Sequence, residues 1–447
     1  MRLDFEKFAG TGLQKAKKMG AEQAELFVVK SRSLEVELKD GRIDEIKQSD
    51  SHGVGLRVIK GHRQGFSFST DFRASALDKM VVQAMENSRY HDEDEDLYFS
   101  AGGQVYPRLN LYDPALKQHS LEDKMQLAQE TAEAAKKWHQ QVSRIERSGY
   151  EEGEVAMWLA NSNGILQHQA GTYCGLFCLA LGEKNGEQQS GYGMDSGISL
   201  AALSPTKAGN MAGKRAVQLL GAAPVNSGMM DLVLEPMIAA QIFGIISACF
   251  SGEAVRKNKS FLADKVGQLI AGTEVTLIDD GCMEQHLASG SFDGEGTATQ
   301  RTVLVENGML KQYLYDCLSA KKAGTVSTGN GVRGSYKGTP HVGTTNYYLA
   351  AGRYSPEQLI GSVEQGIYVT EILGAHTANP VSGDFSFGAS GILIEHGALS
   401  RPVRGVTIAG NLQQLLQKIH GVGNDLTFYG SHGAPTVRIS QIAVSGI

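Results

Sequence analysis

The sequence predicts an α+β protein in which antiparallel sheets dominate and helices are few. Glycine supplies 54 of the 447 residues, whereas proline supplies only 10. This glycine content is about 12%, against a usual ~7% in soluble proteins. Because proline is scarce, we interpret the excess glycine as tight turns and bulges within sheets rather than as flexible linkers. Runs of alternating polarity separated by two-residue turns, such as Asn163-Gly164 and Asn307-Gly308, support the same fold class.

The first predicted unit covers residues 1–110. Helical periodicity predicts a helix from Asp4 to Met19, and two strands joined at Asp40-Gly41 follow it. A second hairpin is expected around Lys60-Gly61, and residues 73–89 return to a helical pattern.

The second predicted unit covers residues 114–224. Ser120 is placed to cap a helix that runs to about Trp138, with Asp123 at the position of a capping box. An antiparallel meander is expected next. The unit closes with a helix that Ser204 caps and that ends before Gly221.

The third predicted unit covers residues 228–447. It opens with the strand DLVLE and continues with an unusually apolar helix, PMIAAQIFGIISACF. A helix that is apolar on all sides is typical of a buried core helix. Two short helices, at 355–361 and 411–420, are expected among further hairpins.

Charge and composition exclude several classes of protein. The net charge is −6 and no long basic block occurs, so nucleic acid is not expected as a partner. No apolar stretch reaches the ~18 residues needed to span a bilayer, and the amino-terminal stretch lacks the apolar core of a signal peptide. The five cysteines form no CxxC motif. These features predict a soluble cytoplasmic protein with reduced cysteines.

Signatures of a self-contained hydrolase are weak. The sequence has 12 histidines, none within five residues of another, and it contains neither HExxH nor HExxxH. Cys174 and Cys178 share one face of a predicted strand, where buried structural thiols are expected rather than a nucleophile. The sequence therefore predicts no catalytic residue and no metal ligand in this chain.

Two glycine-rich segments stand out. Gly329 to Gly334 reads GNGVRG, but its flanks are loop-like, so the strand and helix of a dinucleotide site are missing. The segment 291–302 places Asp293 and Glu295 in a glycine-spaced loop. Carboxylates there could hold a cation, orient a peptide amide or cap turns.

Many collinear motifs resemble those of the TldD/PmbA family, once named modulators of DNA gyrase. They include DLVLEPMIAAQI, FSGEAVRKNKSFLADKVG, SFDGEGTATQRTVLVENGMLKQYLYD, STGNGVRG, SGDFSFGASGILIEHG and APTVRISQIAVSG. The resemblance covers nearly the whole chain and is densest after residue 228. It implies the multi-domain architecture of that family.

The resemblance implies a two-subunit protease that trims peptide leaders and degrades unfolded polypeptides. Its TldD-like subunit carries HExxxH and a carboxy-terminal cysteine as zinc ligands. Here the equivalent helix contains no histidine or acid between Met237 and Phe250, and no cysteine follows Cys317. The chain therefore resembles the PmbA branch, also called TldE, whose zinc is expected in the TldD-like partner. When alone, the chain could form a homodimer.

The resemblance also implies that such a subunit completes a chamber for extended peptides. We expect the two glycine-rich segments to line this chamber. The expected lining residues are Asp293, Gly294, Glu295, Gly296, Thr297, Gly329, Asn330, Gly331, Arg333 and Gly334. Two alternatives stay open at this point: an autonomous peptidase with an unrecognised site, and a non-enzymatic regulator of proteins linked to DNA gyrase.

Overall fold

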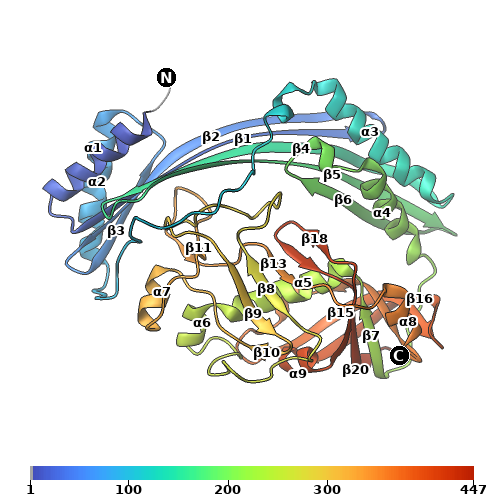
Figure 1. The fold of residues 1–447 in the computed structure, drawn as a ribbon. Helices are drawn as coiled ribbons and strands as arrows, with labels where there is room; N and C mark the ends of the chain where they lie inside the picture. The colour runs from blue at the N-terminus through green and yellow to red at the C-terminus, as the bar shows by residue number, and fades with distance from the viewer. Residues whose placement is uncertain (1–3) are drawn as a thin grey trace.

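A long, curved sheet arches over a compact carboxy-terminal part in the computed structural model, which describes residues 4–447 (Figure 1). Residues 1–3, part of the amino-terminal stretch analysed above, lie outside the described residues. Helices cover the convex face of the sheet near its two ends, and the carboxy-terminal part lies under the concave face (Figure 1). The α+β fold class predicted from the sequence is confirmed.

The long sheet has the strand order β3-β2-β1-β4-β5-β6, and every neighbouring pair is antiparallel. The first two predicted units of the chain, residues 1–110 and 114–224, therefore contribute three strands each to one continuous sheet. The predicted hairpin turns at Asp40-Gly41 and Asn163-Gly164 are confirmed. The strands are β1 (Gln23–Lys39), β2 (Arg42–Lys60), β3 (Arg63–Ser69), β4 (Val142–Asn161), β5 (Leu166–Lys184) and β6 (Glu187–Gly197).

Two pairs of helices cover the convex face. Helices α1 (Phe5–Lys18) and α2 (Ala74–Asn87) lie at one end, and α3 (Leu121–Trp138) and α4 (Pro205–Gln218) lie at the other (Figure 1). Ser120 and Asp123 form the predicted capping box of α3, which satisfies backbone N–H groups at the start of that helix.

Helix α4 approaches the sheet unusually closely because glycines face it. A Cβ atom added at Gly182, Gly191 or Gly193 would lie 2.0–2.2 Å from a backbone oxygen of α4. The facing residues of the helix are the small Ala208, Ala212 and Ala216. Since only a minority of the 54 glycines has a positive φ, the interpretation of the excess as turns and bulges was incomplete. Close packing of helix on strand is a second cause.

The carboxy-terminal part contains two further six-stranded sheets. One has the order β16-β15-β14-β7-β20-β17, and the other has the order β10-β9-β8-β13-β19-β18. Each includes one parallel pair, β14 with β7 and β13 with β19. The strands are β7 (Gly228–Leu234), β8 (Leu277–Asp280), β9 (Arg301–Glu306), β10 (Met309–Leu310), β13 (Tyr347–Leu349), β14 (Gln365–Leu373), β15 (Asp384–Glu395), β16 (Ala398–Asn411), β17 (Ile419–Val422), β18 (Thr427–Tyr429), β19 (His432–Ala434) and β20 (Val437–Ser445).

Short elements complete this part. A separate two-stranded ribbon joins β11 (Gly331–Val332) to β12 (His341–Val342). The helices are α5 (Pro236–Ser247), α6 (Gly252–Arg256), α7 (Cys317–Lys322), α8 (Pro356–Gly361) and α9 (Leu412–Gln417). The two short helices predicted at 355–361 and 411–420 correspond to α8 and α9.

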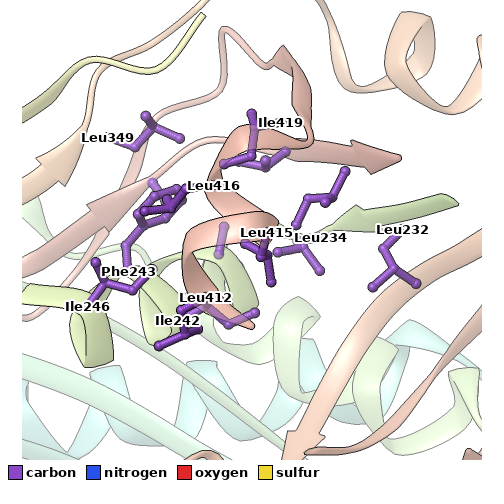
Figure 2. Packing of buried hydrophobic residues seen from close by; sticks show 14 of the residues in the cluster. Leu232, Leu234, Ile242, Phe243, Ile246, Leu349, Leu412, Leu415, Leu416 and Ile419 are labelled. Carbon is purple, nitrogen blue, oxygen red and sulfur yellow. The ribbon is translucent and has the colours of Figure 1, made fainter. Parts of the chain in front are cut away.

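Helix α5 lies in the largest hydrophobic core, between the two carboxy-terminal sheets. Figure 2 shows Ile242, Phe243 and Ile246 of α5 packed among leucines of β7 and α9. This confirms that the apolar helix is buried. Among the helices that the structure describes, none is long and apolar enough to cross a membrane.

Side chains of the long sheet alternate between its convex and concave faces, and the two faces pack against different parts of the chain. Leu26 and Val28 of β1 belong to the core beneath α1 and α2 on the convex side. Phe27, between them, packs with Leu159 of β4 and with Phe292 of the carboxy-terminal part. The concave face of the sheet therefore meets the 291–302 loop directly, and this contact places the candidate site.

We predict opposite effects of two glycine-to-alanine changes on stability. Gly193→Ala should lower the free energy of unfolding by about 3 kcal/mol, because the new methyl group collides with the backbone of α4. Gly10→Ala should raise it by roughly 0.5–1 kcal/mol, because Gly10 lies inside α1 with nothing within 4 Å of the new methyl group. Urea unfolding followed by circular dichroism measures both. Equal effects would contradict the role given to Gly193.

Candidate functional site

A groove runs between the concave face of the long sheet and residues 286–290. It consists of two cavities of about 240 and 250 Å³. The cavities lie side by side because they share the lining residues Met157, Gln169, Leu287 and Ser289. We call the two cavities together the groove.

Strands β4 and β5 supply one wall of the groove. Val155 and Met157 of β4 and Gln169 and Tyr173 of β5 all point to the concave face because they occupy alternate positions. Most of these side chains are apolar or uncharged. Such a wall suits an extended chain held by its backbone and by apolar side chains rather than a highly charged ligand.

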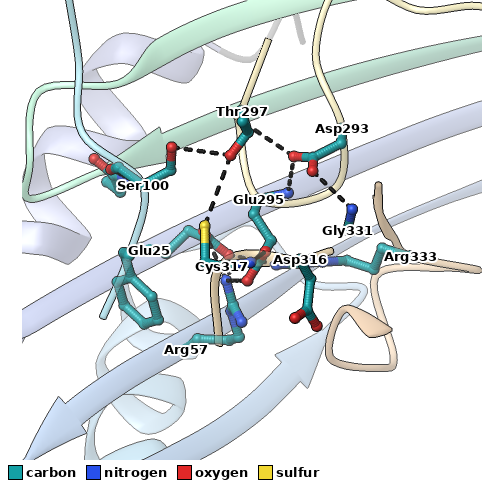
Figure 3. Close-up of polar contacts among 12 residues, drawn as sticks. Glu25, Arg57, Ser100, Asp293, Glu295, Thr297, Asp316, Cys317, Gly331 and Arg333 are labelled. Carbon is teal, nitrogen blue, oxygen red and sulfur yellow. Dashed lines mark hydrogen bonds and ion pairs between the residues drawn. The ribbon is translucent and has the colours of Figure 1, made fainter. Parts of the chain in front are cut away.

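The two glycine-rich segments predicted from the sequence meet at one end of the groove. Asp293 accepts hydrogen bonds from the backbone N–H groups of Glu295 (2.8 Å), Thr297 (3.0 Å) and Gly331 (2.7 Å). The N–H of Gly294 donates to the carbonyl of Gly331 at 2.7 Å. Figure 3 shows the carboxylate of Asp293 between its own loop and Gly331. The turn-capping role that the sequence allowed for this carboxylate is therefore realised by Asp293.

The carboxylates of this region are largely buried, although Asp293 borders the second cavity of the groove. Asp293 is 9% exposed and Glu295 is 3% exposed. Burial and the negative charge of Glu295 raise the pKa of Asp293 above its ordinary value, while the three amide donors oppose that rise. The pKa of Glu295 is raised mainly by burial, against the attraction of Arg57. Both groups are held by protein donors, which suits a structural role.

A buried ionic cluster joins the long sheet to these segments. Glu25 of β1 accepts two hydrogen bonds from Arg57 of β2, both at 3.0 Å. Arg333 of the glycine-rich segment also pairs with Glu25, and Arg57 reaches Glu295 at 3.5 Å. These four side chains are at most 5% exposed (Figure 3). We call Glu25, Arg57, Glu295 and Arg333 the ionic cluster.

The charges of the ionic cluster compensate one another. Burial alone would raise the pKa of Glu25, but Arg57 and Arg333 lower it below its ordinary value. The guanidinium of Arg333 also lies over the ring of Phe27, 4.5 Å from its centroid. Glu25 is therefore charged in the folded protein and holds two strands and one loop together.

Asn330 anchors the centre of the second glycine-rich segment. It is 1% exposed, and its amide donates to Asp279 of β8 at 2.7 Å and to the carbonyl of Gly343 at 3.0 Å. Burial raises the pKa of Asp279 to about 6, against the opposing hydrogen bonds from Asn330 and Thr345. Asn330 thus fixes the loop on the carboxy-terminal sheet.

The structure separates the ten predicted lining residues into three groups. Five line the second cavity of the groove: Asp293, Gly294, Gly329, Gly331 and Arg333. Glu295 and Asn330 are buried in the contacts described above. Gly296, Thr297 and Gly334 lie outside the lining of that cavity. That these residues line a substrate chamber stays a prediction.

Sequence reasoning missed the wall formed by the long sheet and the segment around Leu287. Alternating positions of β4 and β5 could have been assigned to one face from their period of two. No local pattern, however, indicates which face meets residues 286–290. That contact joins residues more than 100 positions apart.

Helix α5 offers no ligands for a metal. Gln241 is its exposed polar residue, and Glu235, which precedes the helix, is paired with Arg215 at 2.6 Å. His432 of β19 lies beside Gly244, but it is a single histidine whose Nε2 is buried without a partner. Within residues 4–447, no group of three or more His, Cys, Asp or Glu side chains is arranged to hold a metal ion.

Comparison with known proteins gives consistent matches along the chain. Residues 24–88 match the PmbA/TldA metallopeptidase domain 1, residues 114–220 match the central domain, and residues 227–446 match the C-terminal domain. The metalloprotease PmbA of Escherichia coli O157:H7 is 27% identical, over 95% of this chain and 92% of its own. A TldD homolog of Haemophilus influenzae is 28% identical, with the same two coverages.

A solved structure supports the same relationship. The putative modulator of a DNA gyrase from Thermotoga maritima superposes with a TM-score of 0.90 at 27% identity, covering 99% of this chain and 100% of its own. Identity alone does not separate the branches, because relatives named PmbA and TldD match about equally well.

We predict that Glu25→Gln lowers the free energy of unfolding by about 3 kcal/mol at neutral pH, because it leaves two buried arginines short of a counter-charge. Since the pKa of Glu25 is lowered on folding, its charge stabilises the protein above the ordinary value of 4.5, and this contribution is lost as the pH falls through the lowered pKa. The difference between wild type and variant should therefore shrink in acid. Urea unfolding at several pH values measures it.

The matched control is Glu86→Gln, because Glu86 is exposed on α2. Its stability should follow that of the wild type throughout the pH range. A Glu25→Gln difference that stays constant in acid would show that the lost interaction is not ionic.

Proposed function

The chain belongs to the PmbA/TldD metallopeptidase family, and on this premise we propose that it is the subunit that completes the peptide groove of a two-subunit zinc protease, in which a TldD-like partner holds the metal. The substrates in this proposal are small or unfolded peptides bound in extended form, as in leader removal or antitoxin turnover.

The observation that carries the proposal is the chemistry of helix α5. A hydrolytic zinc site needs nitrogen, sulfur or carboxylate ligands from two or three neighbouring side chains. Between Met237 and Phe250 there is no histidine, aspartate or glutamate, and the polar Gln241 points to solvent. Cys249 is 1% exposed, and burial raises the pKa of its thiol to about 12, which disfavours the thiolate form that binds zinc. These residues do not fit a zinc site.

Zinc in the partner would supply an activated water and a Lewis acid for peptide hydrolysis. The residues of this chain would act on the substrate by holding it. The groove gives such a role a physical basis, since its walls are mostly uncharged and include Met157, Gln169 and Leu287. The ionic cluster and Asn330 fix the end of the groove in place.

The buried thiols of this chain argue against an autonomous cysteine peptidase. Burial raises the pKa of Cys174 and of Cys178 to about 12, so both are protonated near neutral pH. Cys317 is likewise buried, and its pKa is raised by burial and by the nearby carboxylates Glu295 and Asp293.

We predict that mixing this chain with a TldD-like partner creates activity that neither chain shows alone. Elemental analysis should find near-stoichiometric zinc in the mixture and almost none in this chain by itself. A fluorogenic unstructured peptide reports the activity. Near-stoichiometric zinc on this chain alone, retained through dialysis against a weak chelator, would overturn the proposal.

We predict that filling the groove reduces processing. Val155→Trp places a large ring in the cavity lined by Val155, Met157 and Leu287, and the kcat/KM of the mixed complex should fall at least about tenfold because the peptide loses its wall contacts.

Ala156→Trp is the matched control, since Ala156 is the next residue of β4 and faces the other side of the sheet. It should leave kcat/KM within about twofold of the wild type. Zinc content and unfolding midpoint, measured on both complexes, separate a blocked groove from a damaged fold. Equal losses in both variants would contradict the assignment of the groove.

A further inference from the structure

One carboxylate on the concave face of the long sheet has no partner. Glu151 of β4 lines the first cavity of the groove and is exposed. Within residues 4–447, its side chain forms no ion pair and no hydrogen bond. Among the described residues that line this cavity, Glu151 is the one that carries a carboxylate, and none carries an ammonium or guanidinium group. The groove therefore holds one free negative charge between walls that are mostly uncharged.

The position of Glu151 does not help the sheet to stay folded. Glu35 of β1 lies directly opposite Glu151 in the antiparallel pair of β1 and β4. Side chains of opposite residues point to the same face, and like charges in such a pair destabilise a sheet. Partial burial in the groove and the charge of Glu35 raise the pKa of Glu151. A bound cation would relieve this repulsion.

Other charged groups near this part of the concave face are already engaged. Lys47 of β2 pairs with Glu45 at 2.7 Å, and Arg147 of β4 pairs with Glu37 at 3.5 Å. His286, which lines the same cavity, directs its Nδ1 to a backbone carbonyl at 2.8 Å. These contacts leave the carboxylate in the groove without a counter-charge.

The side chain of Glu151 lies beside the ring of Tyr173. A Cβ atom added at Gly175 of β5 would lie 3.1 Å from Oε1 of Glu151, and one added at Gly153 of β4 would lie 2.4–2.6 Å from the ring and hydroxyl of Tyr173. The pairs Glu151–Gly175 and Gly153–Tyr173 are neighbours on one face of the sheet. Each side chain thus occupies the space that a glycine leaves on the neighbouring strand. A carboxylate next to an aromatic ring can bind a cation by an ion pair and a cation–π contact.

We propose that Glu151 and Tyr173 form a subsite for the positively charged side chain of a Lys or Arg residue in a peptide held by the groove. The inference rests on the proposed function, since it takes the groove as the peptide site, and it adds a preference: segments that are mostly uncharged and carry one basic residue. Long basic side chains suit the subsite because their aliphatic stems can pack on the apolar wall while the charged end reaches the carboxylate. An acidic side chain would meet Glu151 and Glu35 and be disfavoured.

The spacing of the groove places this subsite along the peptide. Val155 lies four residues from Glu151 on the same strand and face, which corresponds to ~13 Å at ~3.3 Å per residue. An extended peptide that follows β4 has the same spacing. The basic residue should therefore lie about four positions from the residue that contacts Val155, and its effect should be confined to one side of the extended chain.

A series of peptides with one lysine at successive positions tests the subsite. The peptides are acetylated and amidated, so that their ends carry no charge, and norleucine replaces lysine in the control series. With the mixed complex, lysine at the matching position should raise kcat/KM over norleucine about fivefold or more, and glutamate there should lower it. Because the charges are partly exposed, the preference for lysine should shrink at high salt.

Charge variants test the role of the carboxylate. Glu151→Gln should abolish the preference for lysine over norleucine, and Glu151→Lys should reverse it in favour of glutamate. Glu86→Gln, at an exposed site on α2, should keep the preference of the wild type. Since Glu35 opposes Glu151, the Glu151→Gln variant should be at least as stable as the wild type in urea, which excludes a damaged fold as the cause of a lost preference.

The outcomes separate this subsite from the proposed function. Equal kcat/KM for lysine and norleucine at every position, or a lysine preference that survives Glu151→Gln, would overturn the subsite while the activity of the mixture upholds the proposed function. If the mixture cleaves none of the peptides, the proposed function fails, and fluorescence anisotropy of dye-labelled peptides on this full-length chain tests the subsite. Tighter binding of a lysine peptide that Glu151→Gln removes would support the subsite, and equal binding would overturn it.

Discussion

The contact between the long sheet and the glycine-rich segments depends on the buried charge of Glu25. One carboxylate receives two arginines, one from the neighbouring strand and one from a segment more than 300 residues away. A buried ion pair adds little net stability compared with apolar packing, but removing one member leaves the others uncompensated. The ionic cluster therefore mainly favours one arrangement of the chain, because only the arrangement that places Arg333 beside Glu25 leaves no buried charge unpaired. This selection fixes the concave face above the loops and so defines the groove.

The two faces of the sheet meet different demands. On the convex face, glycines of β5 and β6 let the backbone of α4 come into direct contact, so this face is committed to dense packing. On the concave face, Phe27, Leu159, Ile165 and Phe292 form a small apolar cluster near the loops, and Met157 packs against it, while Val155 further along β4 lines the groove. A single strand with a period of two thus provides core on one side and groove on the other.

Local features of the fold could be predicted because they depend on neighbouring residues. The turn at Asp40-Gly41 and the capping box of Ser120 and Asp123 are set by short-range backbone chemistry, and both are confirmed. The loop residues Asp293 and Gly331 could be named in advance, but their hydrogen bond could not, since it joins segments 38 residues apart. Close packing at glycines such as Gly193 was not predicted for a related reason: a glycine that permits close packing looks the same in sequence as one that permits a turn. The wall containing Gln169 was missed because its partners, Leu287 and Ser289, are specified only by the assembled fold.

The role proposed for this chain within its family depends on donor chemistry more than on similarity. Relatives named PmbA and TldD are 27% and 28% identical to it, a difference too small to separate two roles. Helix α5 gives a physical criterion instead. A helix that binds a metal must direct at least two ligand side chains toward a water-accessible site, and those side chains cannot also fill a hydrophobic core. Here Ile242, Phe243 and Ile246 fill the core between two sheets, and the exposed stripe of α5 offers one amide, Gln241. The sequence of α5 thus favours packing over metal binding. Its residues therefore support the proposal that this chain helps to hold the substrate and that its partner holds the metal.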